Sequence, residues 1–138
     1  MTVREVVLRI AAALEGASDA PRFEAEQLAA FALGKRRITP FEMEEIFPGK
    51  YSGNELPEEV ERLLSRRLSG EPLQYILGEW SFMGLDFYVK PCALIPRQDT
   101  ETLAEYAIMI AKSRGYSSAL DICTGTGCIA VALKSSAG

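Results

Sequence analysis

The chain has 138 residues, of which 48% are hydrophobic and 25% are charged, and this composition is typical of a globular protein with one or two small domains. Its net charge of −4 is shared evenly by residues 1–70 and 71–138, so neither half offers the basic surface of a nucleic-acid-binding protein. No apolar run approaches the roughly 18 residues of a membrane span, and the absence of histidine excludes Ser-His-Asp and Cys-His catalysis and argues against a zinc site.

Residues 1–70 predict a helical bundle. Thr2 and Glu5 form a capping box, in which each side chain satisfies a backbone N–H group of the first helical turn, and this first helix ends at Gly16. Further helices are expected over about 19–34, 39–47 and 57–68, the second of these beginning with another capping box. On the helices expected over 19–34 and 57–68, the apolar residues that should face inward are Leu28, Phe31, Ala32, Leu56, Val60, Leu63, Leu64 and Leu68.

From Gly70 the pattern changes to that of a β-hairpin with its turn at Gly84, because apolar and polar residues alternate from Leu85 to Lys90. Prolines then favour an extended segment. A helix is expected to begin at Asp99, whose side chain would cap it, and to end at Gly115. The inward-facing stripe expected on this helix consists of Leu103, Ala107, Ile110 and Ala111.

Residues 119–123 predict a short buried strand. The glycine loop Gly125-x-Gly127-x-x-Ala130 follows it and leads into an apolar helix that begins at Cys128. A strand, a glycine loop and a helix in this order open an α/β unit with a parallel sheet. Glycine allows the backbone to approach a ligand closely, and the helix N-terminus presents N–H groups and partial positive charge to it.

Three ligands compete for this loop. A triphosphate is excluded, because the loop does not end in the Gly-Lys-Ser/Thr that a P-loop requires. A dinucleotide remains formally possible. S-adenosylmethionine is favoured by Asp121, which lies four positions before Gly125, although Asp121 could instead cap the strand without touching a ligand. We interpret Cys123 and Cys128 as small buried residues without activated thiols.

Two motifs then indicate a family. The segment "GEPLQYILGEWSFMGLDFYVKPCALIPRQDTETL", followed by "LDICTGTGCIAVAL", resembles the release factor glutamine methyltransferases over the whole chain. The most specific part is "IPRQDTE", residues 95–101, about 20 residues before the glycine loop. The resemblance implies an enzyme that transfers a methyl group from S-adenosylmethionine to the glutamine of the Gly-Gly-Gln motif in peptide chain release factors.

The resemblance also implies a fold and a site. Residues 1–70 would be a helical domain that helps to dock the release factor, 71–98 a hairpin linker, and 99–138 the incomplete start of a Rossmann-like S-adenosylmethionine-binding domain. The residues expected to bind the cofactor are Asp121, Cys123, Thr124, Gly125, Thr126 and Gly127. Those expected to border the site are Arg97, Asp99, Thr100 and Glu101; an ion pair of Arg97 with Asp99 or Glu101 that only fixes the loop is the alternative.

One departure from the family limits this expectation. The Asn-Pro-Pro-Tyr motif that holds the substrate amide in that family does not occur in these 138 residues, so we assign no catalytic residue and expect this chain alone to be inactive. A non-catalytic release-factor-binding module and a dinucleotide-binding protein remain as alternatives. Three cysteines without a CxxC spacing favour a cytoplasmic protein. No metal or membrane partner is expected, and residues from about 99 to 138 are expected to be loosely held or to borrow a partner.

Overall fold

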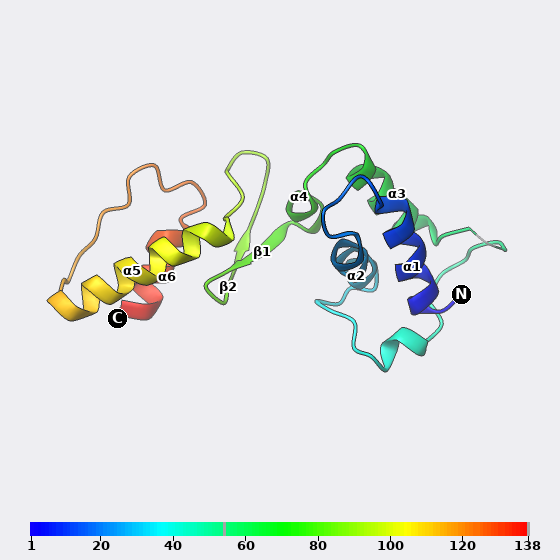
Figure 1. Ribbon diagram of the computed structural model, residues 1–138, viewed down its shortest axis with the longest axis horizontal. Coiled ribbons are helices and arrows are strands. Elements are labelled where there is room, and N and C mark those ends of the chain that lie inside the picture. Colours follow the sequence, from blue (N-terminus) through cyan, green and yellow to red (C-terminus); the bar gives the residue numbers. More distant parts are fainter. Residues whose placement is uncertain (54, 138) are drawn as a thin grey trace. The chain divides into compact units, whose positions relative to one another are not determined.

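The computed structural model describes residues 1–53 and 55–137. It divides into two compact units, Met1–Leu77 (unit 1) and Gly78–Gly138 (unit 2), which are coloured blue to green and green to red in Figure 1. Buried apolar side chains fill the interior of unit 1, and a separate buried cluster lies in unit 2. The elements that form each unit are contiguous in the sequence.

Unit 1 is helical. Its elements are α1 (Val3–Leu14), α2 (Pro21–Ala32), the short 3-10 helix η1 (Glu42–Glu44), α3 (Glu58–Leu68) and α4 (Leu73–Leu77). α1 and α2 lie side by side, and α3 packs against α2 (Figure 1). The largest fully buried side chains of this unit come from α1, α2 and α3 and are Val6, Val7, Ile10, Leu14, Leu28, Val60 and Leu63.

The hydrogen bonds of both predicted capping boxes are present in unit 1. The hydroxyl of Thr2 accepts a hydrogen bond from Glu5 N–H at 3.2 Å, and the carboxylate of Glu5 accepts one from Thr2 N–H at 2.7 Å, which confirms the first capping box. Thr39 and Glu42 exchange the same pair of bonds. The helix after this second box is a single 3-10 turn, however, and not the helix to residue 47 that we expected.

Several side chains of unit 1 differ from the predicted packing. Phe31 and Leu68 are exposed, although both follow the apolar spacing of their helices. In the same turn of α2 as Phe31, Ala29 and Ala30 are buried. α4 was also absent from the prediction, because a five-residue helix is too short to show a periodic pattern.

Unit 2 begins with the predicted β-hairpin. β1 (Glu79–Phe82) pairs antiparallel with β2 (Leu85–Tyr88), and Phe82 lies opposite Leu85. The two-residue loop consists of Met83, with φ of 51°, and Gly84, with φ of 74°. Two positive φ values in a two-residue loop define a type I′ turn, which matches the twist of the strands. Two helices follow the hairpin, α5 (Gln98–Arg114) and α6 (Cys128–Ala137).

The strand predicted over residues 119–123 does not form, and this part of the prediction is wrong. The segment has no regular secondary structure, and the side chains of Leu120 and Ile122 are 85% and 76% exposed. A strand needs a neighbour for its backbone hydrogen bonds. Within residues 1–53 and 55–137, the only sheet is the two-stranded hairpin, and no strand of it pairs with this segment.

The orientation of α5 also differs from the prediction. Ala104 and Ile108 are buried, whereas Leu103 and Ile110 of the predicted stripe are exposed. Both sets follow helical spacing, so α5 is apolar on two faces, and periodicity could not decide which face meets the rest of unit 2. Cys123, which we expected to be buried, is exposed as well, while Cys128 is buried as predicted.

Candidate functional site

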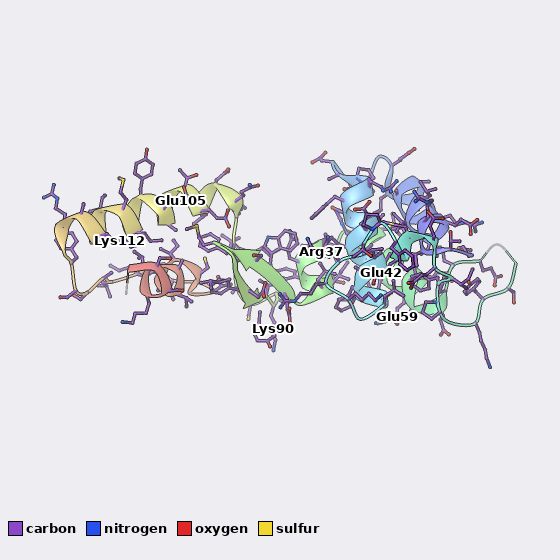
Figure 2. The ribbon with its side chains drawn as sticks, turned by 90° about the horizontal axis from the view of Figure 1, so that it is seen from below. Arg37, Glu42, Glu59, Lys90, Glu105 and Lys112 are labelled. Carbon is purple, nitrogen blue, oxygen red and sulfur yellow. The ribbon has the colours of Figure 1, made fainter. Side chains whose placement is uncertain are left out.

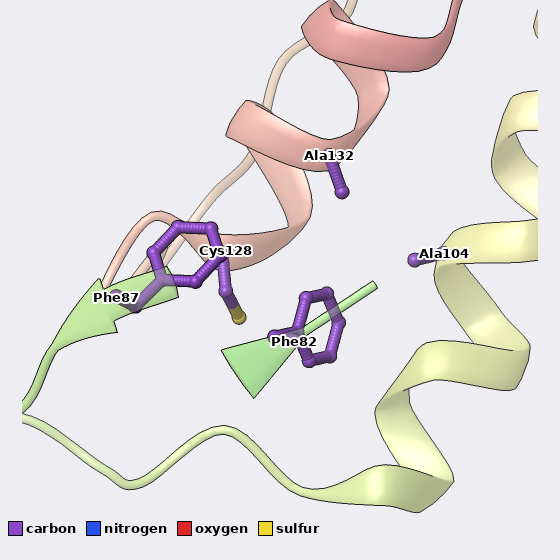
Figure 3. Close-up of a cluster of buried hydrophobic side chains, with 5 residues drawn as sticks. All are labelled: Phe82, Phe87, Ala104, Cys128 and Ala132. Atoms are coloured by element: carbon purple, nitrogen blue, oxygen red, sulfur yellow. The ribbon is translucent and has the colours of Figure 1, made fainter. Parts of the chain in front are cut away.

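The hairpin, α5 and α6 share one small hydrophobic core. It consists of Phe82, Phe87, Ala104, Cys128 and Ala132, all buried (Figure 3). The two phenylalanine rings meet edge to face, with centroids 6.2 Å apart at an angle of 81°, the arrangement that aromatic pairs favour. Because Ala104 lies in the second turn of α5 and Cys128 opens α6, the beginnings of both helices meet at the hairpin. The "IPRQDTE" segment, which leads into α5, and the glycine loop, which leads into α6, therefore lie at the same end of unit 2.

The glycine loop makes a tight, ordered turn before α6. Gly125 and Gly127 have φ of 56° and 76°, which only glycine adopts readily. Gly127 N–H donates to the carbonyl of Thr124 at 2.9 Å, and the Thr124 hydroxyl donates to the carboxylate of Asp121 at 2.8 Å. A Cβ added at Gly125 would meet nothing within 4 Å, so the protein itself leaves space beside this backbone. Glycine is required here for the backbone conformation.

The predicted cofactor residues are thus contiguous in space, although their surroundings differ. Cys123, Thr124 and Gly125 are exposed, whereas Asp121, Thr126 and Gly127 are half-buried. Cys123 has φ of 62°, a left-handed conformation that is uncommon for residues other than glycine. The structure brings these residues together in one turn, and their role towards a ligand remains a prediction.

The segment "IPRQDTE" enters α5 differently from the prediction. Arg97 occupies the N-cap position without a side-chain capping bond, and Asp99 lies exposed within the first turn, so Asp99 does not cap the helix. The negative charges of Asp99 and Glu101 still suit the partial positive charge of this helix end. Glu101 Oε1 accepts a hydrogen bond from Met83 N–H at 2.6 Å. This bond links the motif to the hairpin turn, a contact that sequence spacing gave no means to find.

The structure bears on two other kinds of site. Among residues 1–53 and 55–137, no group of three cysteine, aspartate or glutamate side chains gathers closely enough to hold a metal ion. None of the helices in this described part of the chain has the length and apolarity needed to cross a bilayer.

The fold and the site define a class of protein in which a helical unit precedes a β-hairpin and two helices, the second of which begins directly after a glycine loop. Comparison with known proteins makes this more specific. Residues 5–78 match the family model of the PrmC N-terminal domain. The chain belongs to the release factor glutamine methyltransferase family, of which it carries the N-terminal part.

The relatives extend the similarity beyond the family model. The release factor glutamine methyltransferase of Nitratidesulfovibrio vulgaris is 42% identical over 120 residues, which cover 83% of this chain and 37% of that protein. The protein of the same name from Koribacter versatilis is 36% identical over 134 residues, covering 96% of this chain and 46% of the relative. The chain therefore spans less than half the length of these curated relatives.

Proposed function

We propose that this chain is part of an enzyme that methylates the glutamine of the Gly-Gly-Gln motif in peptide chain release factors, with S-adenosylmethionine as methyl donor. Family membership supports the reaction class. The observation that carries the proposal is the core formed by the hairpin, α5 and α6, which brings the beginnings of the two helices to the same hairpin. A cytoplasmic location fits the three free thiols.

The residues of the glycine loop fit the proposed cofactor. The turn from Cys123 to Gly127 is largely exposed, the space beside Gly125 is open, and the loop ends at the N-terminus of α6. In this proposal the turn and the carboxylate of Asp121 hold the cofactor, and Arg97, Asp99, Thr100 and Glu101 border it. S-adenosylmethionine, when bound, supplies an electrophilic methyl group.

The contribution of this chain to the reaction is orientation. An amide nitrogen is a weak nucleophile, and correct positioning of two reactants can be worth roughly 7–11 kcal/mol. The sequence lacks the Asn-Pro-Pro-Tyr motif that the resemblance assigns to the substrate amide. We therefore propose that these 138 residues dock the substrate and carry part of the cofactor site, and do not transfer the methyl group by themselves.

The exposed apolar residues of unit 2 support a Rossmann-like domain in the whole protein. Leu120 and Ile122 are among the most exposed large apolar side chains of the chain, and Leu103, Tyr106 and Ile110 lie exposed along α5. Strands of parallel sheets are apolar on both faces because helices cover them. We propose that residues 119–123 become such a strand where neighbouring strands are present.

A second candidate is a release-factor-binding module without catalysis. It is favoured by unit 1, which has a closed core together with exposed aromatic side chains. The most exposed of these is Phe41 at 80%, and Phe23 and Phe31 are exposed on α2. Exposed aromatic residues are often the anchors of protein interfaces.

Calorimetric titration separates the two candidates. The chain is titrated with S-adenosylhomocysteine, with a purified bacterial release factor and with NADH. The proposed function predicts binding of the release factor and saturable binding of S-adenosylhomocysteine that Gly125→Val abolishes, because valine resists a φ of 56°. Release-factor binding without any binding of S-adenosylhomocysteine would favour the module, and saturable binding of NADH would contradict both.

A further inference from the structure

The hydrogen bond from Met83 to Glu101 joins two segments 18 residues apart in the sequence. Met83 occupies the first position of the hairpin loop with φ of 51°, a conformation that side chains other than glycine, asparagine and aspartate rarely adopt. The strand ladder pairs Phe82 with Leu85 and leaves Met83 outside it. The Met83 N–H group is satisfied instead by the half-buried carboxylate of Glu101, at 2.6 Å. Charge-assisted hydrogen bonds of this kind are about twice as strong as neutral ones.

The anchored turn is continuous with the core that supports the glycine loop. Phe82 directly precedes Met83, is 1% exposed, and packs in the cluster with Cys128 and Ala132 of α6 (Figure 3). Met83 and Leu85 pack against the same cluster from its edge. A displacement of the turn would therefore move Phe82 against the first two turns of α6. Cys128, the first residue of α6, follows Gly127 of the glycine loop directly.

We propose that Glu101 is a positioning residue: its carboxylate anchors the hairpin turn to α5 and, through Phe82, sets the position of the helix that carries the glycine loop. This role differs from the one that the resemblance gives to Glu101, at the border of the cofactor site. Its effect on cofactor affinity rests on the proposed function, whereas the anchoring of the turn does not.

Three variants of the 138-residue chain test the proposal. Glu101→Ala removes the acceptor, and Glu101→Gln keeps an amide oxygen in its place. Glu105→Ala is the matched control, because Glu105 lies one turn further along α5 and is exposed (Figure 2). Hydrogen exchange of the Met83 amide is followed by NMR. A long-range correlation across the hydrogen bond, between the Met83 nitrogen and the Glu101 carboxylate carbon, is recorded in the wild-type chain.

We expect the cross-bond correlation in the wild type, and exchange of the Met83 amide roughly 10- to 100-fold faster in Glu101→Ala, the range for a lost hydrogen bond to a charged group. Glu101→Gln should restore part of the protection, because a neutral amide oxygen accepts a weaker hydrogen bond than a carboxylate, and Glu105→Ala should match the wild type. The affinity for S-adenosylhomocysteine should follow the same order. Rescue by glutamine would show that the variant Glu101→Ala loses a hydrogen-bond acceptor, because glutamine keeps the acceptor oxygen and lacks the negative charge.

Two results would overturn the proposal: a wild-type Met83 amide that exchanges like an unstructured peptide and shows no correlation, or equal Met83 exchange in the wild type and Glu101→Ala. If Glu101→Ala does not fold, the anchoring role of Glu101 is tested by the wild-type correlation and by the exchange of the Met83 amide in Glu101→Gln. If the wild-type chain does not bind S-adenosylhomocysteine, the cofactor part of the proposed function fails, while the exchange of Met83 still decides the anchoring role.

Discussion

Among single residues, Arg67 and Glu24 form an ion pair whose side chains are only 17% and 14% exposed. Arg67 of α3 donates through Nε and Nη2 to the two carboxylate oxygens of Glu24 of α2, at 2.7 and 3.1 Å. Exposed pairs contribute about 0–1 kcal/mol, and breaking a buried pair costs about 3–5 kcal/mol. For this intermediate case we expect Arg67→Ala to lower the free energy of unfolding of unit 1 by about 1–3 kcal/mol.

Urea unfolding followed by circular dichroism measures this loss. The neighbouring Arg66 is the matched control: it lies at the same end of α3 and pairs with Glu71 beyond the helix, but its side chain is 36% exposed, so Arg66→Ala should cost less. A double-mutant cycle of Arg67→Ala with Glu24→Ala should show a favourable coupling between the two residues. Equal losses for Arg66→Ala and Arg67→Ala would contradict the prediction.

Glu42 should make the stability of the chain depend on pH in the acid range. Its pKa is lowered from 4.5 to about 2, first by the hydrogen bond from Lys35 and then by the N–H and hydroxyl groups of Thr39. Because the folded pKa lies below the unfolded one, the stabilisation is fully present above pH 4.5 and is lost as the pH falls towards about 2.

Thermal melting of the wild type and Glu42→Gln between pH 6 and pH 2 tests this sign. The wild type should be the more stable protein at pH 6, and the difference should shrink as the pH falls. Glu58→Gln serves as the control, because Glu58 is exposed at the start of α3. A difference between wild type and Glu42→Gln that grows in acid would rule out the assigned direction of the pKa shift.

At the scale of elements, the two apolar faces of α5 should respond very differently to substitution. Ile108 is buried, and Ile110, two residues later, is exposed. Removing a buried isoleucine side chain beyond Cβ costs about 2–5 kcal/mol, whereas exposed substitutions usually change stability by less than about 0.5 kcal/mol. We expect Ile108→Ala to destabilise unit 2 and Ile110→Ala to leave it nearly unchanged.

Near-ultraviolet circular dichroism and urea unfolding report on this pair of variants, which differ only in the position of one deleted side chain. Similar losses for both would mean that Ile110 is covered in solution. The outcome would then show that both apolar faces of α5 are packed.

The sequence predicted well those elements that are determined by residues close together in the chain. The capping box of Thr2 and Glu5 and the alternation from Leu85 to Val89 depend on residues a few positions apart, and both are present. The strand at 119–123 and the buried face of α5 depend on which neighbours are available. The bond from Met83 to Glu101 also lies in this second class, because no periodic pattern connects a turn amide with a carboxylate 18 residues later.

At the scale of the whole molecule, protection from hydrogen exchange should be uneven. Unit 1 has fully buried side chains on α1, α2 and α3, such as Ile10 and Leu28, and we expect its amides to be the most protected and residues 1–70 to fold alone. Residues 119–123 have no strand partner within the described part of the chain and expose Leu120 and Ile122, so their amides should exchange at nearly the unprotected rate.

Hydrogen exchange measured by NMR on the monomeric chain tests this uneven protection. Strong protection of the amides across residues 119–133 would contradict the prediction. A chain of the full length of the relatives provides the complementary measurement. If residues 119–123 are a strand of a Rossmann-like sheet there, the amides of Leu120 and Ile122 should become protected, because neighbouring strands would accept and donate the missing backbone hydrogen bonds. Residues 119–123 would then be apolar because they form a buried strand of that sheet in the longer chain.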